Sequence, residues 1–135
     1  MNSQLEPISE REGFENSYRV FRETLEAVAM PPIQACEAYG GYNVAGEFVL
    51  DLRAGQYLCE SPASTLTLEQ KAGVARLIST VNQVPREAAS FTDRASESIA
   101  NLEHPSWVPV REQAAALLNV LDSATQSNNA YFSAK

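Results

Sequence analysis

Apolar residues recur at intervals of three and four along the first quarter of the chain, and arginines and glutamates fill the positions between them. This spacing is typical of one buried face of an α-helix. The stripe consists of Phe14, Tyr18, Phe21, Leu25 and Val28. Ser9 and Glu12 have the spacing of a capping box at its start, and Pro31-Pro32 ends it because proline cannot donate a hydrogen bond. The pattern predicts a helix over residues 10–30 with its aromatic stripe in the core.

Three later stretches show the same helical spacing. They predict helices over residues 68–83, 85–102 and 107–125 or beyond. Thr67 and Gln70 form a second capping box, while Pro85 and Pro105 stand at helix boundaries. Because short connections favour antiparallel neighbours, we predict a mainly α fold built as an antiparallel four-helix bundle.

The stretch from residue 39 to residue 59 departs from this pattern and holds four of the six glycines and three of the five tyrosines. From Phe48 to Arg53, apolar and polar residues alternate as in a half-buried strand, and Ala54-Gly55 could turn the chain into a second strand. Val44, Phe48, Leu52 and Cys59 also fall near a helical stripe. The sequence thus predicts a small β-hairpin or irregular insertion within residues 31–66, between the first two helices, with a helix as the open alternative.

The length of 135 residues predicts a single domain, with residues 1–8 as a flexible lead. The chain begins without the charged and apolar regions of a signal peptide. Its apolar runs are shorter than the roughly 18 residues that a membrane span needs. We therefore expect a cytoplasmic protein, with a removed signal peptide left open.

The net charge of −7 should repel nucleic acid and anionic membranes. The basic residues are dispersed, which also disfavours nucleic-acid binding. The excess of acid serves either plain solubility or attraction of a basic protein partner.

Sequence motifs for nucleotide binding and hydrolysis are missing, because the chain has no GxGxxG, GxxxxGK[ST], GxSxG or HExxH. We therefore expect no enzyme activity and no cofactor. Cys36 and Cys59 stand far from His104 and lack the paired spacing of a zinc site, so no metal is expected. The two cysteines are either free thiols or a disulfide across the central stretch. His104 fits a structural role at a helix end.

Aromatic and acidic side chains gather in and around the central stretch. Tyrosine provides a large contact area at low entropic cost, and carboxylates steer a basic partner. The candidate partner-binding residues are Glu37, Tyr39, Tyr42, Glu47, Asp51, Tyr57 and Glu60. The competing interpretation is that these aromatic side chains fill the space between the insertion and the helices.

In size, charge and helical class, the chain is similar to small, acidic, mainly helical bacterial proteins that neutralise a toxin by capping it. This likeness implies a non-enzymatic protein-binding domain, such as an immunity-type inhibitor or adaptor, acting on a basic protein. The alternative function is a small-molecule-binding or enzymatic helical domain with a pocket near Cys59 and His104. Homodimerisation through an exposed helical stripe is compatible with either.

Overall fold

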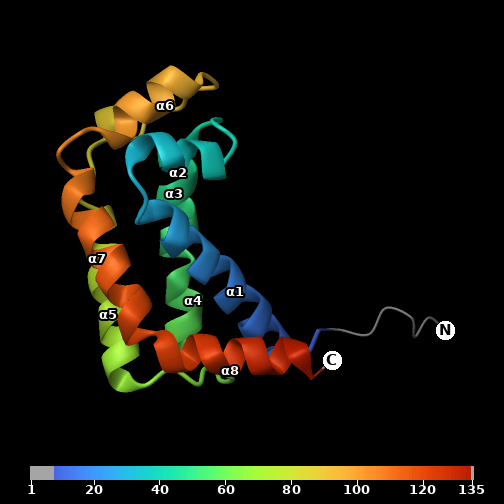
Figure 1. The fold of residues 1–135 in the computed structure, drawn as a ribbon. Helices are drawn as coiled ribbons and strands as arrows, with labels where there is room; N and C mark the ends of the chain where they lie inside the picture. The colour runs from blue at the N-terminus through green and yellow to red at the C-terminus, as the bar shows by residue number, and fades with distance from the viewer. Residues whose placement is uncertain (1–7, 135) are drawn as a thin grey trace.

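The computed structural model describes residues 8–134, and within that range the chain is all-α, with no β-strand (Figure 1). The predicted flexible lead at residues 1–8 falls, apart from Ile8, outside the described residues. The helices in chain order are α1 (Glu10–Val28), α2 (Pro32–Ala38), α3 (Val44–Arg53), α4 (Gly55–Glu60), α5 (Leu68–Val81), the 3₁₀ turn η1 (Arg86–Ala88), α6 (Ala95–Leu102), α7 (Trp107–Val120) and α8 (Asp122–Ser133).

The first and second predicted helices are confirmed as α1 and α5. The Ser9 hydroxyl accepts a hydrogen bond from the backbone N–H of Glu12 at 3.1 Å, which starts α1. Thr67 and Gln70 form the complete capping box at the start of α5, with bonds of 3.1 and 2.9 Å. These local signals fix where both helices begin.

The predicted hairpin is wrong, because residues 44–60 form α3 and α4. Val44, Phe48 and Leu52 recur every four residues and are all buried, whereas Leu50, which the strand pattern placed beside Phe48, is 60% exposed. The period of two over a few residues was a coincidence inside a helical stripe. Far from being an insertion, α3 and α4 pack against both α1 and α5.

The predicted helix over residues 85–102 is also wrong in its first half, where only η1 precedes α6. The Thr92 hydroxyl accepts from the backbone N–H of Arg94 at 3.1 Å and donates to Glu97 at 2.6 Å. The carbonyl of Thr92 accepts from the N–H of Asn43 at 2.6 Å. Such side-chain bonds compete with helix formation. Phe91, in this irregular segment, is 68% exposed.

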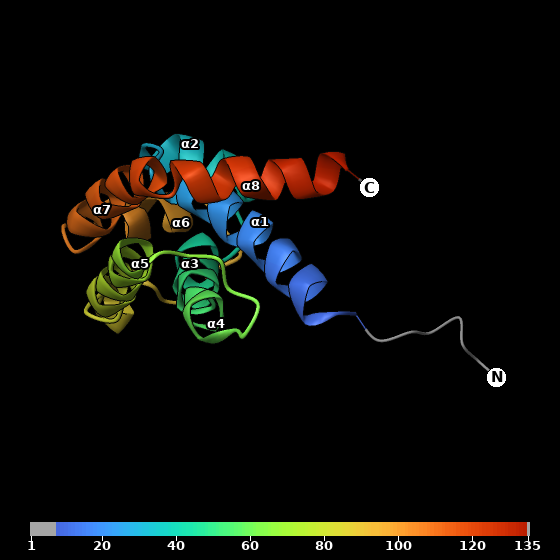
Figure 2. The same ribbon diagram turned by 90° about the horizontal axis from the view of Figure 1, so that it is seen from below.

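The fourth predicted helix is divided at Leu121 into α7 and α8, and α8 turns away from α7 (Figures 1 and 2). Side chains from other helices bind the carbonyls at this bend. Tyr18 donates to the carbonyl of Leu121 at 3.3 Å, and Gln70 donates to that of Val120 at 3.1 Å. The bend lays α8 along the N-terminal half of α1, which it contacts.

The core lies among α1, α3, α5 and α7, each of which contributes several fully buried side chains. Trp107, at the start of α7, is buried and donates from Nε1 to the carbonyl of Ala88 at 2.9 Å. This bond ties the irregular segment before α6 to the body of the protein.

Candidate functional site

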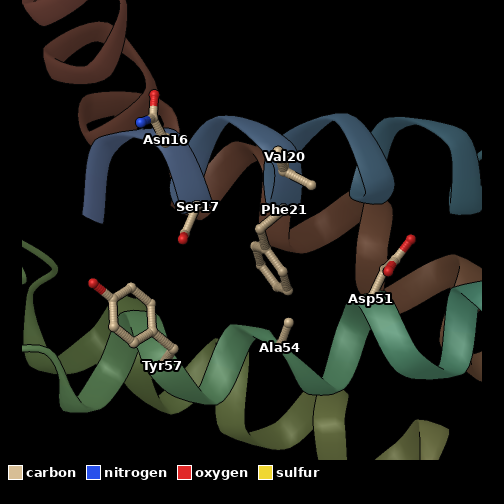
Figure 3. A pocket seen from close by; sticks show the side chains of 7 residues that line it. All are labelled: Asn16, Ser17, Val20, Phe21, Asp51, Ala54 and Tyr57. Atoms are coloured by element: carbon tan, nitrogen blue, oxygen red, sulfur yellow. The ribbon is translucent and has the colours of Figure 1, made fainter. Parts of the chain in front are cut away.

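A groove of about 310 Å³ runs between α1 and the continuous pair α3–α4 (Figure 3). Its size is at the lower end of ligand pockets, which span roughly 300–1,000 Å³. It has two walls: one comes from α1 and the other from α3–α4. The lining residues are Asn16, Ser17, Val20, Phe21, Asp51, Ala54 and Tyr57.

The groove has a firm floor because α4 approaches α1 closely at Gly55. A Cβ atom at Gly55 would lie 2.6 Å from Cε1 of Phe21 and 3.0 Å from Cγ1 of Val74. Carbon atoms pack at about 3.5–4.0 Å, so only glycine fits here without displacement. Ala54 keeps the right-handed helical conformation, with φ −62° and ψ −17°, so α3 leads directly into α4.

Figure 3 shows an apolar middle between two polar ends. The ring of Phe21 points into the gap above Ala54. Tyr57 and the Ser17 hydroxyl lie at one end, and Asp51 lies at the other. The side chains of Val20 and Tyr57 are exposed, at 53% and 41%. The groove therefore offers apolar surface with an acid at one end.

Asp51 is held in place by Tyr39, whose hydroxyl donates to Oδ2 at 3.1 Å. The same hydroxyl shares a 2.7 Å hydrogen bond with Thr24, and the Tyr39 ring packs edge-on against Phe48 with centroids 4.6 Å apart. Burial raises the pKa of Tyr39 to about 12, and the negative charges of Asp51 and Glu47 add to the increase. The raised pKa thus reflects mainly the burial of the phenol, with a smaller contribution from the two nearby carboxylates.

Glu47 and Asp51 stand four residues apart on α3, so two like charges share one side of the helix. Neither takes part in a salt bridge within residues 8–134. Two arginines on α1 and α3 have other partners: Arg22 pairs with Glu26 at 3.1 Å, and Arg53 donates to Asn82 at 2.7 Å. Within the described residues, the acidic wall therefore has no salt-bridge partner.

A second hollow, of about 380 Å³, lies between α1 and α2 and shares Val20 with the groove. Glu23 and Glu26 line it, together with the apolar Ala27 and Met30. The exposed side of α1 thus has acidic and apolar side chains next to each other along much of its length.

The structure distributes the predicted partner-binding residues over several places. Asp51 and Tyr57 line the groove, and Glu47 stands one turn from Asp51. Tyr39 is half-buried, with its hydroxyl bonded inside the protein. Glu60, at the end of α4, accepts a bond from Gln56 at 2.8 Å.

Glu37 and Tyr42 lie elsewhere, near α6. Glu37 lines a hollow of about 450 Å³ between α2 and α6. Tyr42 meets Phe91 edge-on, with ring centroids 5.5 Å apart, and both rings are exposed. This exposed aromatic pair is separate from the α1–α3–α4 groove.

The α1 wall of the groove was missed by the sequence analysis. Asn16, Ser17 and Val20 flank the apolar stripe of α1, and Phe21 belongs to it and was assigned to the core. Val20 was the one hint of this wall in the sequence, because it is an apolar residue outside the apolar stripe of α1. The structure shows that its side chain is exposed. A sequence cannot show which neighbouring helix such a residue faces.

The pair Cys59 and His104 is not brought together. Cys59 lies on α4, where its thiol contacts the carbonyl of Lys71 at 3.8 Å. His104 lies between α6 and α7, where its Nδ1 accepts from the N–H of Ser106 at 3.1 Å. Figure 1 shows α4 and the α6–α7 junction at opposite ends of the protein. Both cysteines are free, and burial raises the pKa of both the Cys36 and Cys59 thiols.

Within the described residues, no three His, Cys, Asp or Glu side chains are placed to hold a metal ion. None of the helices in residues 8–134 has the length and apolar character needed to cross a membrane. No family model, curated protein or solved structure matches this chain.

Proposed function

We propose that this chain is a non-enzymatic protein-binding domain that binds a basic protein partner through the α1–α3–α4 groove. The observation that carries the proposal is the pairing of exposed apolar surface at Val20 and Tyr57 with an acidic wall at Glu47 and Asp51 that forms no salt bridge within residues 8–134. Apolar surface supplies binding free energy, and charge of one sign selects the partner and speeds association.

The groove face extends onto the outer side of α3. Leu50 is 60% exposed and lies one turn before Ala54, and Tyr57 follows Ala54 by three residues. Glu47 precedes Leu50 by three residues and so lies on the same side. Such a surface, with apolar residues bordered by acids, suits a partner whose contact residues are apolar and basic.

The form of binding that we favour is that of an immunity-type inhibitor or adaptor, which acts by covering its partner. The groove walls are helices packed on the core, so the surface is formed before binding. A preformed surface loses little conformational entropy on association. The net charge of −7 supports the choice of a basic partner.

The test compares variants in affinity capture from the lysate of the source organism, followed by calorimetry with the purified captured protein. Tyr57→Ala should weaken binding by at least about tenfold, which corresponds to about 1.4 kcal/mol. Phe91→Ala is the matched control, because it removes an even more exposed aromatic ring outside the groove. Binding to Phe91→Ala should equal that of wild type, and thermal unfolding should show both variants folded.

Added salt should weaken the interaction, because the partner is basic and the groove wall is acidic. A captured protein whose affinity falls with Phe91→Ala and not with Tyr57→Ala would move the interface to the α2–α6 end. Identical captured proteins for wild type and Tyr57→Ala, at equal affinity, would contradict the proposal.

A further inference from the structure

The groove combines an apolar middle with a carboxylate at one end, and this arrangement matches the shape of one kind of side chain. Lysine and arginine place a hydrocarbon stem before a cationic head. Val20 and Ala54 provide apolar surface for a stem above the mostly buried ring of Phe21, and Asp51 lies next to them as the anion (Figure 3). Asp51 and Tyr57 are six residues apart, so the groove is roughly 9 Å long at 1.5 Å per helical residue.

Asp51 is oriented but not neutralised. Its Oδ2 accepts from Tyr39 at 3.1 Å, and Tyr39 is itself fixed by Thr24 and by contact with Phe48. Its Oδ1 makes no hydrogen bond or salt bridge within the described part of the chain. A half-buried carboxylate in this state has the position and the capacity to accept a charge-assisted hydrogen bond from outside.

Glu47 adds a second negative charge close to Asp51. It lies one turn before Asp51, and two like charges at this spacing destabilise a helix. A cation placed at Asp51 would relieve that repulsion, whereas Arg22 on α1 and Arg53 on α3 are engaged with Glu26 and Asn82. The local charges are thus complementary to one added positive charge.

We infer that the groove is an anchor site for a lysine or arginine side chain of the partner, with its stem over Phe21 and Ala54 and its cation on Asp51. The inference rests on the proposed function and names the chemistry that the partner must present. Tyr57 and Ser17, at the other end, lie where the partner's backbone would approach the groove.

The experiment uses small probes that carry only this chemistry. The ¹⁵N-labelled protein is titrated with n-butylguanidinium and n-butylammonium, and the neutral n-butanol serves as the control. The cationic probes should cause saturable changes in amide chemical shifts, mainly at residues 16–21 and 50–57. The neutral n-butanol should bind with at most about a third of the affinity of the cationic probes.

Asp51→Asn should weaken binding of the cationic probes at least about threefold, since the amide keeps an acceptor for Tyr39 but loses the charge. Glu37→Gln is the matched control, because it removes a carboxylate that lies outside the groove, and it should leave binding unchanged. The comparison with n-butanol on the wild-type protein gives the same information if Asp51→Asn fails to fold.

Equal binding of cations and alcohol, or cation shifts scattered over the surface, would overturn the anchor site. So would unchanged binding of the cations to a folded Asp51→Asn variant. Those results would not contradict the proposed function if Tyr57→Ala still weakens binding to the captured partner. Conversely, the cationic probes could bind in the groove while Tyr57→Ala binds the captured partner as tightly as wild type does. That result would contradict the proposed function but not the cation site.

Discussion

Replacing Gly55 with alanine tests the helix contact that forms the floor of the groove. The added methyl would lie 2.6 Å from Cε1 of Phe21 and 3.0 Å from Val74, both of which are buried. Relieving contacts this short requires movement of a packed ring, and overpacking of this kind costs about 1–3 kcal/mol. Alanine in place of glycine inside a helix returns about 1 kcal/mol. Because the closest contact is with a rigid ring, we expect an overpacking cost in the upper part of that range, about 2–3 kcal/mol, and therefore a net loss of about 1–2 kcal/mol.

The assay is urea unfolding followed by circular dichroism, supported by thermal melting. A loss of that size should lower Tm by roughly 4–8 °C for a domain of this length. Gly13→Ala is the matched control, because it lies inside α1 and its Cβ would meet only the Tyr57 hydroxyl at 3.2 Å. It should stabilise the protein by about 0.5–1 kcal/mol.

A double-mutant cycle identifies the source of the effect. Phe21→Leu shortens the ring side chain, so Gly55→Ala should cost much less in that background than in wild type. A Gly55→Ala protein that is as stable as wild type, or more stable, would refute the reasoning. It would mean that α4 lies farther from α1, and the groove would then lack its floor.

Three further predictions concern buried polar groups. The raised pKa of Tyr39, about 12, means that its phenol ionises first in the unfolded chain, so the contribution of Tyr39 to stability should be constant below pH 10 and be lost between pH 10 and 12. Urea midpoints across this range should fall less steeply for Tyr39→Phe. Some slope should remain, because burial also raises the pKa of Tyr18 and of both cysteine thiols. Trp107→Phe removes the donor to Ala88 and should cost about 1–3 kcal/mol in urea unfolding, with faster amide exchange in η1. Gln70→Ala loses its capping bond and its bond to Val120, and should cost about 2–3 kcal/mol by the same assay, whereas an unchanged midpoint would contradict those contacts.

The helices that the sequence predicted well have strong local signals at their ends. Ser9 and Thr67 cap α1 and α5 through bonds that span three residues, so a short stretch of sequence contains all the information. Pro31-Pro32 likewise follows the end of α1. Local chemistry of this kind does not depend on the rest of the fold.

The predictions that failed depend on partners distant in sequence. The bend at Leu121 is bound by Tyr18, which is 103 residues away. Thr92 holds its segment out of a helix partly through a backbone bond to Asn43. The strand pattern around Phe48 failed because a few alternating residues fit a helix as well as a strand. Residue spacing alone could not distinguish these outcomes.

Only part of the candidate site was predicted, because the rest depends on contacts between residues that are distant in sequence. Asp51 and Tyr57 were selected for their chemistry, and both line the groove. Val20 and Phe21 were not selected, because their role depends on α3–α4 lying beside α1. Composition indicated which types of residue to examine, whereas the fold determined which of them share one surface.

The most direct test of the account is amide hydrogen exchange of this protein with and without its captured, purified partner. The account predicts that binding slows exchange in residues 16–21 and 50–57, which form the two walls of the groove. Residues 33–42 and 91–99, at the α2–α6 end, should exchange at unchanged rates. Protection confined to the α2–α6 end, with none along α1 and α3–α4, would contradict the central claim.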